Sequence, residues 1–161
     1  SDDRGVSVCR LYGDFNGSWV INQTDTSVVS GTQDYFYLNL SNGSYIWNVW
    51  CNDTVNNGVF NATNYTITVD TVASTVELNS MANNTNVSYD DISFNWTATD
   101  NLDLGLSCNL TIDGAVNVSF IESSNATEVN YTLFDIAEGT HTWNVTCVDN
   151  ASNVISVKYF Y

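Results

Sequence analysis

Apolar and polar residues alternate in short runs along most of this chain. In the clearest run, Trp143, Val145 and Cys147 alternate with Asn144 and Thr146. Because successive side chains of a β-strand point to opposite faces, this pattern predicts a strand that buries the cysteine beside the tryptophan. No segment shows the apolar spacing of three and four residues that a helix requires. Turn-forming clusters separate the runs, and the second half of the chain contains seven predicted strands, at 75–81, 92–99, 106–112, 116–121, 128–134, 141–148 and 154–161.

The clearest run occurs twice. Residues 43–54 read GSYIWNVWCNDT, and residues 139–150, 96 positions later, read GTHTWNVTCVDN. A second cysteine precedes each copy, Cys9 in the first and Cys108 in the second, and an acidic residue with an Asn-rich turn follows each copy. A match at a fixed spacing over most of a chain indicates a duplicated structural unit. The 161 residues are therefore predicted to form two all-β domains, 1–70 and 71–161.

The second domain has the strand count of an immunoglobulin-like sandwich, which holds about seven short strands. Asp113 and Gly114 predict a hairpin turn between its third and fourth strands. The first domain lacks two strands, because nothing before Cys9 corresponds to residues 75–98. A half-sandwich leaves Trp47 and its neighbours in water. Two explanations stay open: preceding residues of a longer repeat protein supply the strands, or another subunit completes the sheet in a head-to-tail polymer.

The four cysteines occupy matched places, one pair in each domain. Four cysteines allow three pairings, and the repeat favours Cys9 with Cys51 and Cys108 with Cys147. A zinc site is the other interpretation, but zinc ligands cluster at short spacing and His141 is the only histidine. Disulfides indicate an oxidising compartment.

Sixteen of the 23 asparagines begin the sequence Asn-x-Ser/Thr, the acceptor motif of N-glycosylation. With 35 Ser and Thr residues, chance predicts about five such motifs. The alternative is an Asn-rich and Thr-rich surface in which composition alone creates the motif. The acceptor residues are Asn16, Asn22, Asn39, Asn42, Asn52, Asn61, Asn64, Asn83, Asn86, Asn95, Asn109, Asn117, Asn125, Asn130, Asn144 and Asn150.

The acceptor asparagines that fall in predicted strands share one feature. Each alternates with apolar residues, as Asn144 does between Trp143 and Val145, so each is expected to face away from the core. A bulky, hydrophilic glycan fits only on that face. The asparagines concerned are Asn39, Asn95, Asn109, Asn117, Asn130 and Asn144, and Asn64, which directly precedes the alternating run of Tyr65, Ile67 and Val69.

Several phrases resemble a known family. They are FNWTATD at 94–100, IDG at 112–114, WNVTCVDNASN at 143–153 and the linker VDTVAST at 69–75. They resemble the fibronectin type III and related immunoglobulin-like repeats of prokaryotic surface proteins, and most closely those of archaeal cell-surface glycoproteins. The resemblance implies a fold and a surface setting, and it implies no activity.

The chain departs from related patterns in three places. Cys108 lies in the third strand, whereas antibody domains have a cysteine in the second, so the bridge is expected to join neighbouring strands of one sheet. Val49 and Val145 stand where antibody domains carry tyrosine, two residues before the second cysteine. Ser74 stands where the family's linker usually has proline.

Charge and composition exclude several functions. A formal charge of −15 with three basic residues leaves no cations to neutralise the phosphates of a nucleic acid. No apolar run is long enough to span a bilayer, and the first residues do not resemble a signal peptide. Both predicted disulfides consume the thiols, and His141 begins a strand where Tyr45 stands in the other repeat, so we expect no enzyme. The carboxylates of Asp100 and Asp103 are expected to be solvated turn residues or calcium ligands.

Calcium is the one metal considered further. Its weak candidate ligands are Asp70 in the linker, Asp100 and Asp103 after the second strand, and Asp149 after the sixth. Calcium takes six to eight oxygen ligands, and backbone carbonyls would have to supply the rest. The spacing matches no calcium-loop motif, so no firm site is predicted.

Two tryptophans do not fit the core pattern. Trp50 has outward parity, with Thr146 at the matching place, and Trp19 begins the second strand of a hairpin. Exposed tryptophans stack on sugars or anchor protein interfaces. Trp50 lies two residues from the acceptor Asn52, so a covered interface or the protein's own glycan is expected there before a foreign sugar.

Together these features predict a non-enzymatic structural subunit or repeat of a heavily N-glycosylated extracellular filament, sheath or cell-surface array. Its expected partners are copies of itself or adjacent repeats of a longer chain, without nucleic acid and without membrane insertion of this segment. Covalent N-linked glycans are expected, and calcium is possible, with no other cofactor. The alternative is a stalk or adhesin module that binds carbohydrate or a partner cell surface. A further alternative, accessory domains of a carbohydrate-active enzyme, requires a catalytic domain outside these residues.

Overall fold

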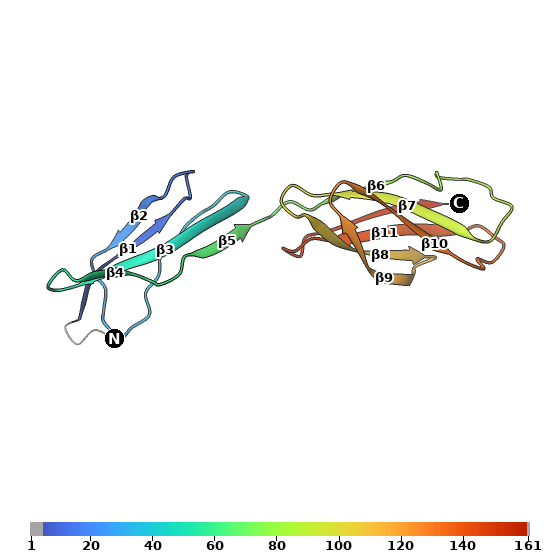
Figure 1. Ribbon diagram of the computed structural model, residues 1–161. Helices are drawn as coiled ribbons and strands as arrows, with labels where there is room; N and C mark the ends of the chain where they lie inside the picture. Colours follow the sequence, from blue (N-terminus) through green and yellow to red (C-terminus); the bar gives the residue numbers. More distant parts are fainter. Residues whose placement is uncertain (1–4, 161) are drawn as a thin grey trace. The chain divides into compact units, whose positions relative to one another are not determined.

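The computed structural model describes residues 5–160, which form twelve β-strands and no helix. The chain divides into two compact units, Ser1–Asp70 and Thr71–Tyr161 (Figure 1). Each unit contains one disulfide, Cys9–Cys51 in the first and Cys108–Cys147 in the second. The all-β class and the two intradomain bridges are therefore confirmed.

The second unit is a sandwich of two antiparallel sheets. One sheet has the order β10-β7-β6 and the other has the order β12-β11-β8-β9, which is the arrangement of an immunoglobulin-like sandwich. Its strands are β6 (Thr75–Leu78), β7 (Ile92–Thr99), β8 (Gly105–Ile112), β9 (Ala115–Ser124), β10 (Thr127–Leu133), β11 (Thr142–Val148) and β12 (Val154–Phe160).

These strands match the seven predicted ones to within one residue, except at two ends where the difference is three residues. The first strand stops at Leu78 because the ladder becomes irregular after it. The amides of Asn79 and Ser80 both donate to the Asn95 carbonyl, and the Asn95 amide donates to Ser80 Oγ. Met81 then adopts a left-handed φ of 57°, which an extended strand cannot accommodate. The fourth strand runs on to Ser124, because pairing with β8 continues beyond irregularities in the register. Tyr161, the end of the last predicted strand, lies outside the described residues.

The turn between β8 and β9 forms as predicted. Asp113 and Gly114 are its two central residues and both have positive φ, 49° and 83°. This is the backbone of a type I′ turn, whose twist matches that of the flanking strands.

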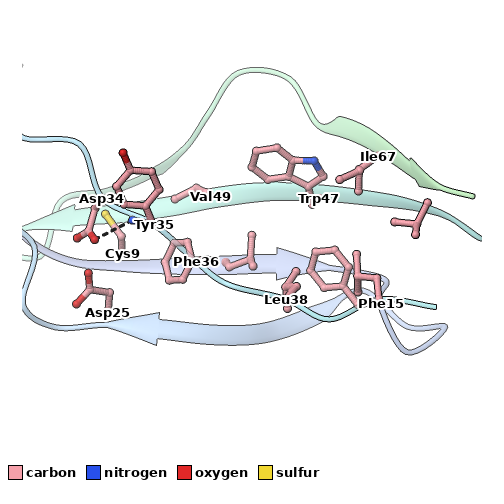
Figure 2. Close-up of a pocket in the computed structure, with 13 residues that line it drawn as sticks. Cys9, Phe15, Asp25, Asp34, Tyr35, Phe36, Leu38, Trp47, Val49 and Ile67 are labelled. Atoms are coloured by element: carbon pink, nitrogen blue, oxygen red, sulfur yellow. Dashed lines mark hydrogen bonds between the residues drawn. The ribbon is translucent and has the colours of Figure 1, made fainter. Parts of the chain in front are cut away.

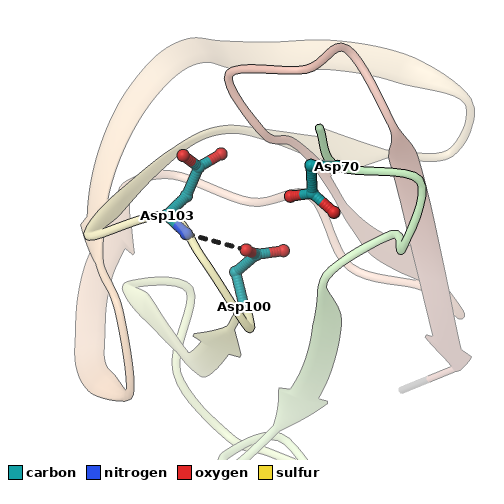
Figure 3. A group of neighbouring side chains, drawn as sticks. All are labelled: Asp70, Asp100 and Asp103. Carbon is teal, nitrogen blue, oxygen red and sulfur yellow. Dashed lines mark hydrogen bonds between the residues drawn. The ribbon is translucent and has the colours of Figure 1, made fainter. Parts of the chain in front are cut away.

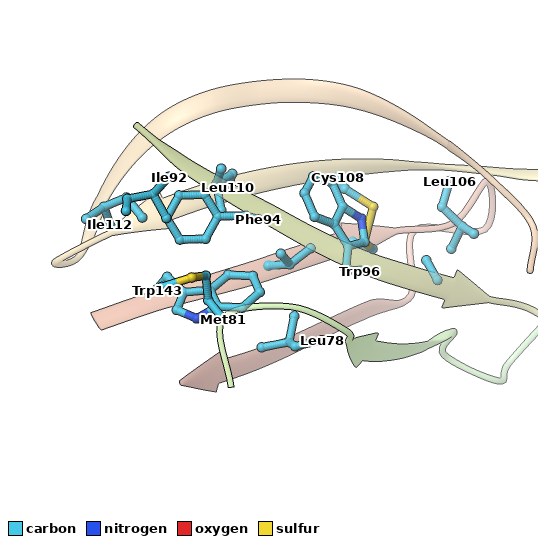
Figure 4. Packing of buried hydrophobic residues seen from close by; sticks show 13 residues of the cluster. Leu78, Met81, Ile92, Phe94, Trp96, Leu106, Cys108, Leu110, Ile112 and Trp143 are labelled. Carbon is cyan, nitrogen blue, oxygen red and sulfur yellow. A yellow bond between two sulfur atoms is a disulfide. The ribbon is translucent and has the colours of Figure 1, made fainter. Parts of the chain in front are cut away.

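The core of the second unit lies between its two sheets (Figure 4). Phe94 and Trp96 of β7 and Trp143 of β11 are completely buried, and the rings of Phe94 and Trp143 lie 5.0 Å apart. Cys108 and Cys147 are buried with them. The alternating residues of 142–148 thus form a strand, and its apolar side chains lie in a closed core.

The first unit is a single antiparallel sheet. Its order is β2-β1-β3-β4, and β5 also pairs with β3. The strands are β1 (Val6–Gly13), β2 (Val20–Asp25), β3 (Gly43–Asp53), β4 (Gly58–Phe60) and β5 (Tyr65–Val69). The described part of this unit has no second sheet, as expected from the missing counterparts of 75–98.

The segment 35–40 forms no strand, although its sequence resembles that of β10. In the second unit β10 forms its ladder with β7. Residues 5–70 of the first unit contain no counterpart of β7, so within them the backbone of 35–40 has no strand to pair with. The placement of Asn39 in a strand is therefore corrected, although Asn39 is exposed as expected.

Both disulfides join directly opposed residues of neighbouring strands. Cys9 faces Cys51 across β1 and β3, and Cys108 faces Cys147 across β8 and β11, with Cα atoms 4.1 Å apart in each pair. The prediction that each bridge lies within one sheet is confirmed. The bridge therefore fixes strand register and does not hold two sheets together.

Candidate functional site

None of the sixteen acceptor asparagines is buried. Eleven are exposed, and the five half-buried ones are Asn52, Asn95, Asn109, Asn125 and Asn144. The contrast is Asn48, the counterpart of Asn144, which lies outside any acceptor motif and is only 2% exposed. Its amide donates to the Asn61 carbonyl and to Asn64 Oδ1. The outward parity expected for β3 therefore fails at Asn48, because the chain around Asn61 and Asn64 covers that face.

Both sheets of the second unit carry acceptors on their outer faces. Asn95 of β7 and Asn130 of β10 are directly opposed in the register. On the other sheet, Asn109 of β8 and Asn144 of β11 alternate with buried residues along their strands. Because each face carries more than one acceptor, carbohydrate at these positions would cover both sides of the sandwich.

The open face of the first unit forms an apolar groove of about 680 Å³ (Figure 2). It is lined from β1, β3 and β5, and from the unpaired segment that includes Phe36 and Leu38. The lining residues are Cys9, Leu11, Phe15, Asp25, Asp34, Tyr35, Phe36, Leu38, Leu40, Trp47, Val49, Ile67 and Val69.

One end of this groove is acidic. Asp25 and Asp34 lie there near Cys9 (Figure 2). The hydrogen bond with Asp34, together with those from Ser27, holds the pKa of the Asp25 carboxyl below its usual value. The rest of the groove matches the inner face that the second unit buries, so this surface is a half-core without its second sheet.

The calcium candidates do not share one role. Asp149 and its counterpart Asp53 each close the turn after the repeated strand. Asp149 accepts hydrogen bonds from the backbone and side-chain amides of Asn153, and Asp53 accepts the same pair from Asn57. The residue before that asparagine has a left-handed backbone in both turns, with a φ of 67° at Asn56 and 71° at Ser152. The sequence indicated an acidic residue and an Asn-rich turn at both places, but it did not reveal that the Asp carboxylate closes the turn by these hydrogen bonds.

Asp100 and Asp103 lie in the turn between β7 and β8 (Figure 3). Asp100 Oδ1 accepts from the amides of Leu102 and Asp103, and Oδ2 is buried without a hydrogen bond from the described residues. The Asp103 carboxylate accepts from the backbone and side-chain amides of Asn150. Asp70 is the last residue of the first unit. Calcium binding at these residues stays a prediction.

Trp50 is covered by its own unit. The Arg10 guanidinium lies 5.1 Å from the Trp50 ring centroid, and Gly58 lies so close to the ring that a Cβ there would clash. Trp19 is 43% exposed and stacks on Tyr12 with ring centroids 6.3 Å apart. Of the two candidate interface tryptophans, Trp19 is therefore the more accessible.

His141 holds a turn. One ring nitrogen lies 2.7 Å from Asp113 Oδ2 and the other lies 2.8 Å from the Ala137 carbonyl. The Asp113 hydrogen bond raises the pKa of His141, and the same bond lowers the pKa of Asp113. In the first unit Tyr45 makes the matching contact. Its hydroxyl donates to the carbonyl of Ser41, which is the counterpart of Ala137. The described contacts of His141 are thus structural ones.

Of the comparisons with known proteins, the one with solved structures found matches. No protein-family model and no curated protein sequence matches this chain. Among solved structures, the fibronectin(III)-like modules of Clostridium thermocellum CbhA resemble it at 17% sequence identity and a TM-score of 0.45, with 99% of this chain and 80% of that chain covered. The fold assignment rests on strand order and pairing.

Within residues 5–160, no helix is long and apolar enough to cross a bilayer. The two disulfides fit a secreted or extracellular setting, because such bridges persist in oxidising compartments. Immunoglobulin-like sandwiches are used widely as non-catalytic modules, and the fold by itself assigns no reaction.

Proposed function

We propose that this chain is a structural repeat or subunit of a heavily N-glycosylated extracellular filament, sheath or cell-surface array. The observation that carries the proposal is the position of the sixteen acceptor asparagines, none of which is buried. On the second unit, Asn95 and Asn130 occupy the outer face of one sheet, and Asn109 and Asn144 occupy that of the other. A module coated with carbohydrate on both faces is suited to a mechanical and protective role. Its contacts with other proteins would then form at the sheet edges and at the ends of the sandwich.

Stability outside the cell is supported by the two bridges. Each closes a loop of about forty residues, which is worth about 4 kcal/mol in the chain-entropy model. The net charge of −15 keeps copies apart in solution unless ions or glycans screen it. Assembly is therefore expected to depend on shape-matched contacts.

The open face of the first unit supports a role in a continuous array. Residues 35–40 line this face and correspond to β10, which in the second unit pairs with β7. The missing partner is therefore a strand with apolar residues at alternate positions, like Ile92, Phe94 and Trp96 of β7. Two strands like β6 and β7 would supply this partner, either from preceding residues of a longer repeat protein or from another subunit.

Electron cryomicroscopy of the native material, combined with glycopeptide mass spectrometry, tests this function. We expect a regular assembly or array with carbohydrate density on the outward asparagines, and a strand paired with residues 35–40. If that strand comes from a neighbouring molecule, the chain is a polymer subunit. Absence of carbohydrate at all sixteen asparagines would refute the proposal.

The second candidate function is an adhesin or stalk module. The exposed and stacked Trp19 with Tyr12 favours it, because aromatic faces bind sugar rings. A glycan array probed with enzymatically deglycosylated protein separates the two functions. An adhesin shows saturable binding that is lost in Trp19→Ala, whereas a purely structural repeat shows none.

A further inference from the structure

The side-chain amide of Asn125 forms different hydrogen bonds from those of the acceptors Asn109 and Asn117. It follows Ser124, the last residue of β9, and precedes β10. Its backbone amide donates to the Leu104 carbonyl, and its side-chain oxygen accepts from the amide of Asp100. Its side-chain nitrogen donates to the carbonyls of Asp100 and Asp103, at 2.9 and 2.7 Å. Four hydrogen bonds thus tie Asn125 to the turn between β7 and β8.

These contacts fix the orientation of the Asn125 amide. An Asn amide has one oxygen that accepts and one nitrogen that donates two hydrogens. If the amide were rotated by half a turn, its nitrogen would face the N–H of Asp100 and its oxygen would face two carbonyls. The assignment of oxygen and nitrogen therefore follows from the partners.

N-glycosylation conflicts with this arrangement. The sugar is attached to the side-chain nitrogen and replaces one of its two hydrogens. Both hydrogens of Asn125 are directed to carbonyl oxygens of the turn. A sugar at Asn125 would remove one of these bonds, occupy the space of a carbonyl partner, and leave that carbonyl unpaired in a half-buried site.

Asn109 and Asn117 show the opposite arrangement. The Asn109 side-chain oxygen accepts from the amide of Phe120 and that of Asn117 accepts from the amide of Ile112, each at 3.0 Å. These bonds fill the two irregularities in the pairing of β8 and β9. Within the described residues, neither side-chain nitrogen donates a hydrogen bond, so a sugar can replace a hydrogen at no cost to these contacts.

Five further acceptors each donate one hydrogen bond from the side-chain nitrogen. Each of them retains a second hydrogen that a sugar can replace. They are Asn52, Asn61, Asn95, Asn144 and Asn150.

We propose that Asn125 is a structural clamp that stays unglycosylated in the folded protein, whereas Asn109 and Asn117 carry glycans on side chains whose oxygens hold the β8–β9 pairing. This inference rests on the proposed function to the extent that it requires a glycosylated protein. It divides the acceptor motifs by the hydrogen bonds of the amide, which the motif itself does not encode.

Two matched substitutions test the proposal in the full chain, produced in a host that glycosylates this protein. Thr127→Val removes the acceptor motif of Asn125 and the bond from the Thr127 hydroxyl to the Asn125 carbonyl, but it keeps the four hydrogen bonds of the clamp. Ser119→Ala removes the motif of Asn117 and keeps its side chain. Intact mass and glycopeptide analysis are the readouts. We expect Thr127→Val to lose no glycan and Ser119→Ala to lose one. A glycan lost in Thr127→Val would overturn the assignment of Asn125 while leaving the proposed function in place.

A stability measurement tests the clamp independently of carbohydrate. Asn125→Ala removes three side-chain hydrogen bonds, and we expect it to lower the unfolding temperature of the second unit by at least about 4 °C relative to Thr127→Val. Equal unfolding temperatures for the two variants would overturn the clamp. If Asn125→Ala fails to fold while Thr127→Val folds, the clamp is supported. If none of the sixteen asparagines carries a glycan, both this inference and the proposed function fail.

Discussion

Trp47 and Trp143 occupy the same place in a duplicated strand, yet their surroundings differ. Trp143 is completely buried between two sheets and its ring contacts Phe94. Trp47 is half-buried, lines the open groove and stacks on Tyr65 with ring centroids 5.1 Å apart. The two strands form the same ladder and the same cross-strand disulfide. Local sequence therefore specifies the sheet, while burial of its inner face depends on a second sheet.

The largest expected difference between the units is the loss in free energy of unfolding when these tryptophans are replaced. Trp143→Ala should lower the free energy of unfolding of the second unit by about 3–5 kcal/mol, because it opens a cavity in a closed core. Trp47→Ala should cost the first unit about 1 kcal/mol, since the side chain is partly in water and loses mainly its ring contact. Urea unfolding followed by amide hydrogen exchange of each unit measures both losses. Similar losses would show that the groove is closed in solution.

The disulfides provide a comparison in which the units should agree. The bridged residues are 42 positions apart in the first unit and 39 in the second. Replacing both cysteines of one bridge by alanine should therefore lower the free energy of unfolding by about 4 kcal/mol in either unit. Calorimetry of the two double variants gives the values. A much smaller loss in the first unit would indicate that its half-sandwich has little cooperative structure to lose.

The turn after the repeated strand should also behave alike in both units. Asp53→Ala and Asp149→Ala each remove a carboxylate that accepts from both amides of an asparagine four residues later, so each should cost about 2 kcal/mol. Asp→Asn at the same positions is the control, because it retains an acceptor for the backbone amide. Thermal unfolding of the four variants measures the costs. An alanine variant no less stable than its asparagine control would disprove the role assigned to the turn.

The smallest expected difference is a loss of stability above neutral pH that only the second unit should show. The pKa of His141 is raised by Asp113, so its contribution to stability is complete below about pH 6.5 and is lost as pH rises through the raised value. The lowered pKa of Asp113 removes the contribution at the acid end, as pH falls below about 4. The Asp113 side chain is 50% exposed, so the effect should stay below about 1 kcal/mol.

Unfolding temperatures of the two units between pH 6 and pH 9 measure this effect. His141→Gln should abolish the decline in the second unit. The first unit should show no matching decline, because Tyr45 replaces the histidine. A second-unit stability that rises over this range would contradict the assigned linkage.

The repeat made much of the fold predictable. Cysteines at matched positions identified both bridges, and alternation identified the strand 92–99 at both of its ends. The predictions failed where side chains replace the regular ladder. Ser80 Oγ accepts from the Asn95 amide just beyond the end of β6, and Asn117 Oδ1 accepts from the Ile112 amide at an irregularity in the pairing of β9. Neither event changes the alternation of apolar and polar residues.

The candidate sites were predictable to a smaller degree. The acceptor motif identifies Asn125 and Asn117 alike, since it records only the residue two positions later. The tertiary structure separates them, because the hydrogen-bond partners of Asn125 come from a turn more than twenty residues away. Asp149 is a second example. The sequence offered its carboxylate as a calcium ligand, and the structure shows that both of its oxygens accept hydrogen bonds from Asn153.

By itself, the sequence determined the all-β class, the duplication, the pairing of cysteines and the surface position of the acceptor asparagines. These properties depend on side-chain alternation and on matched positions, which are local. The tertiary structure alone decided which repeated strand is buried, which amides keep a free hydrogen and which acidic residues close turns. Those properties depend on what lies opposite each side chain. In this chain the opposing group comes from a distant strand or turn, and the described residues of the first unit provide no second sheet opposite its inner face.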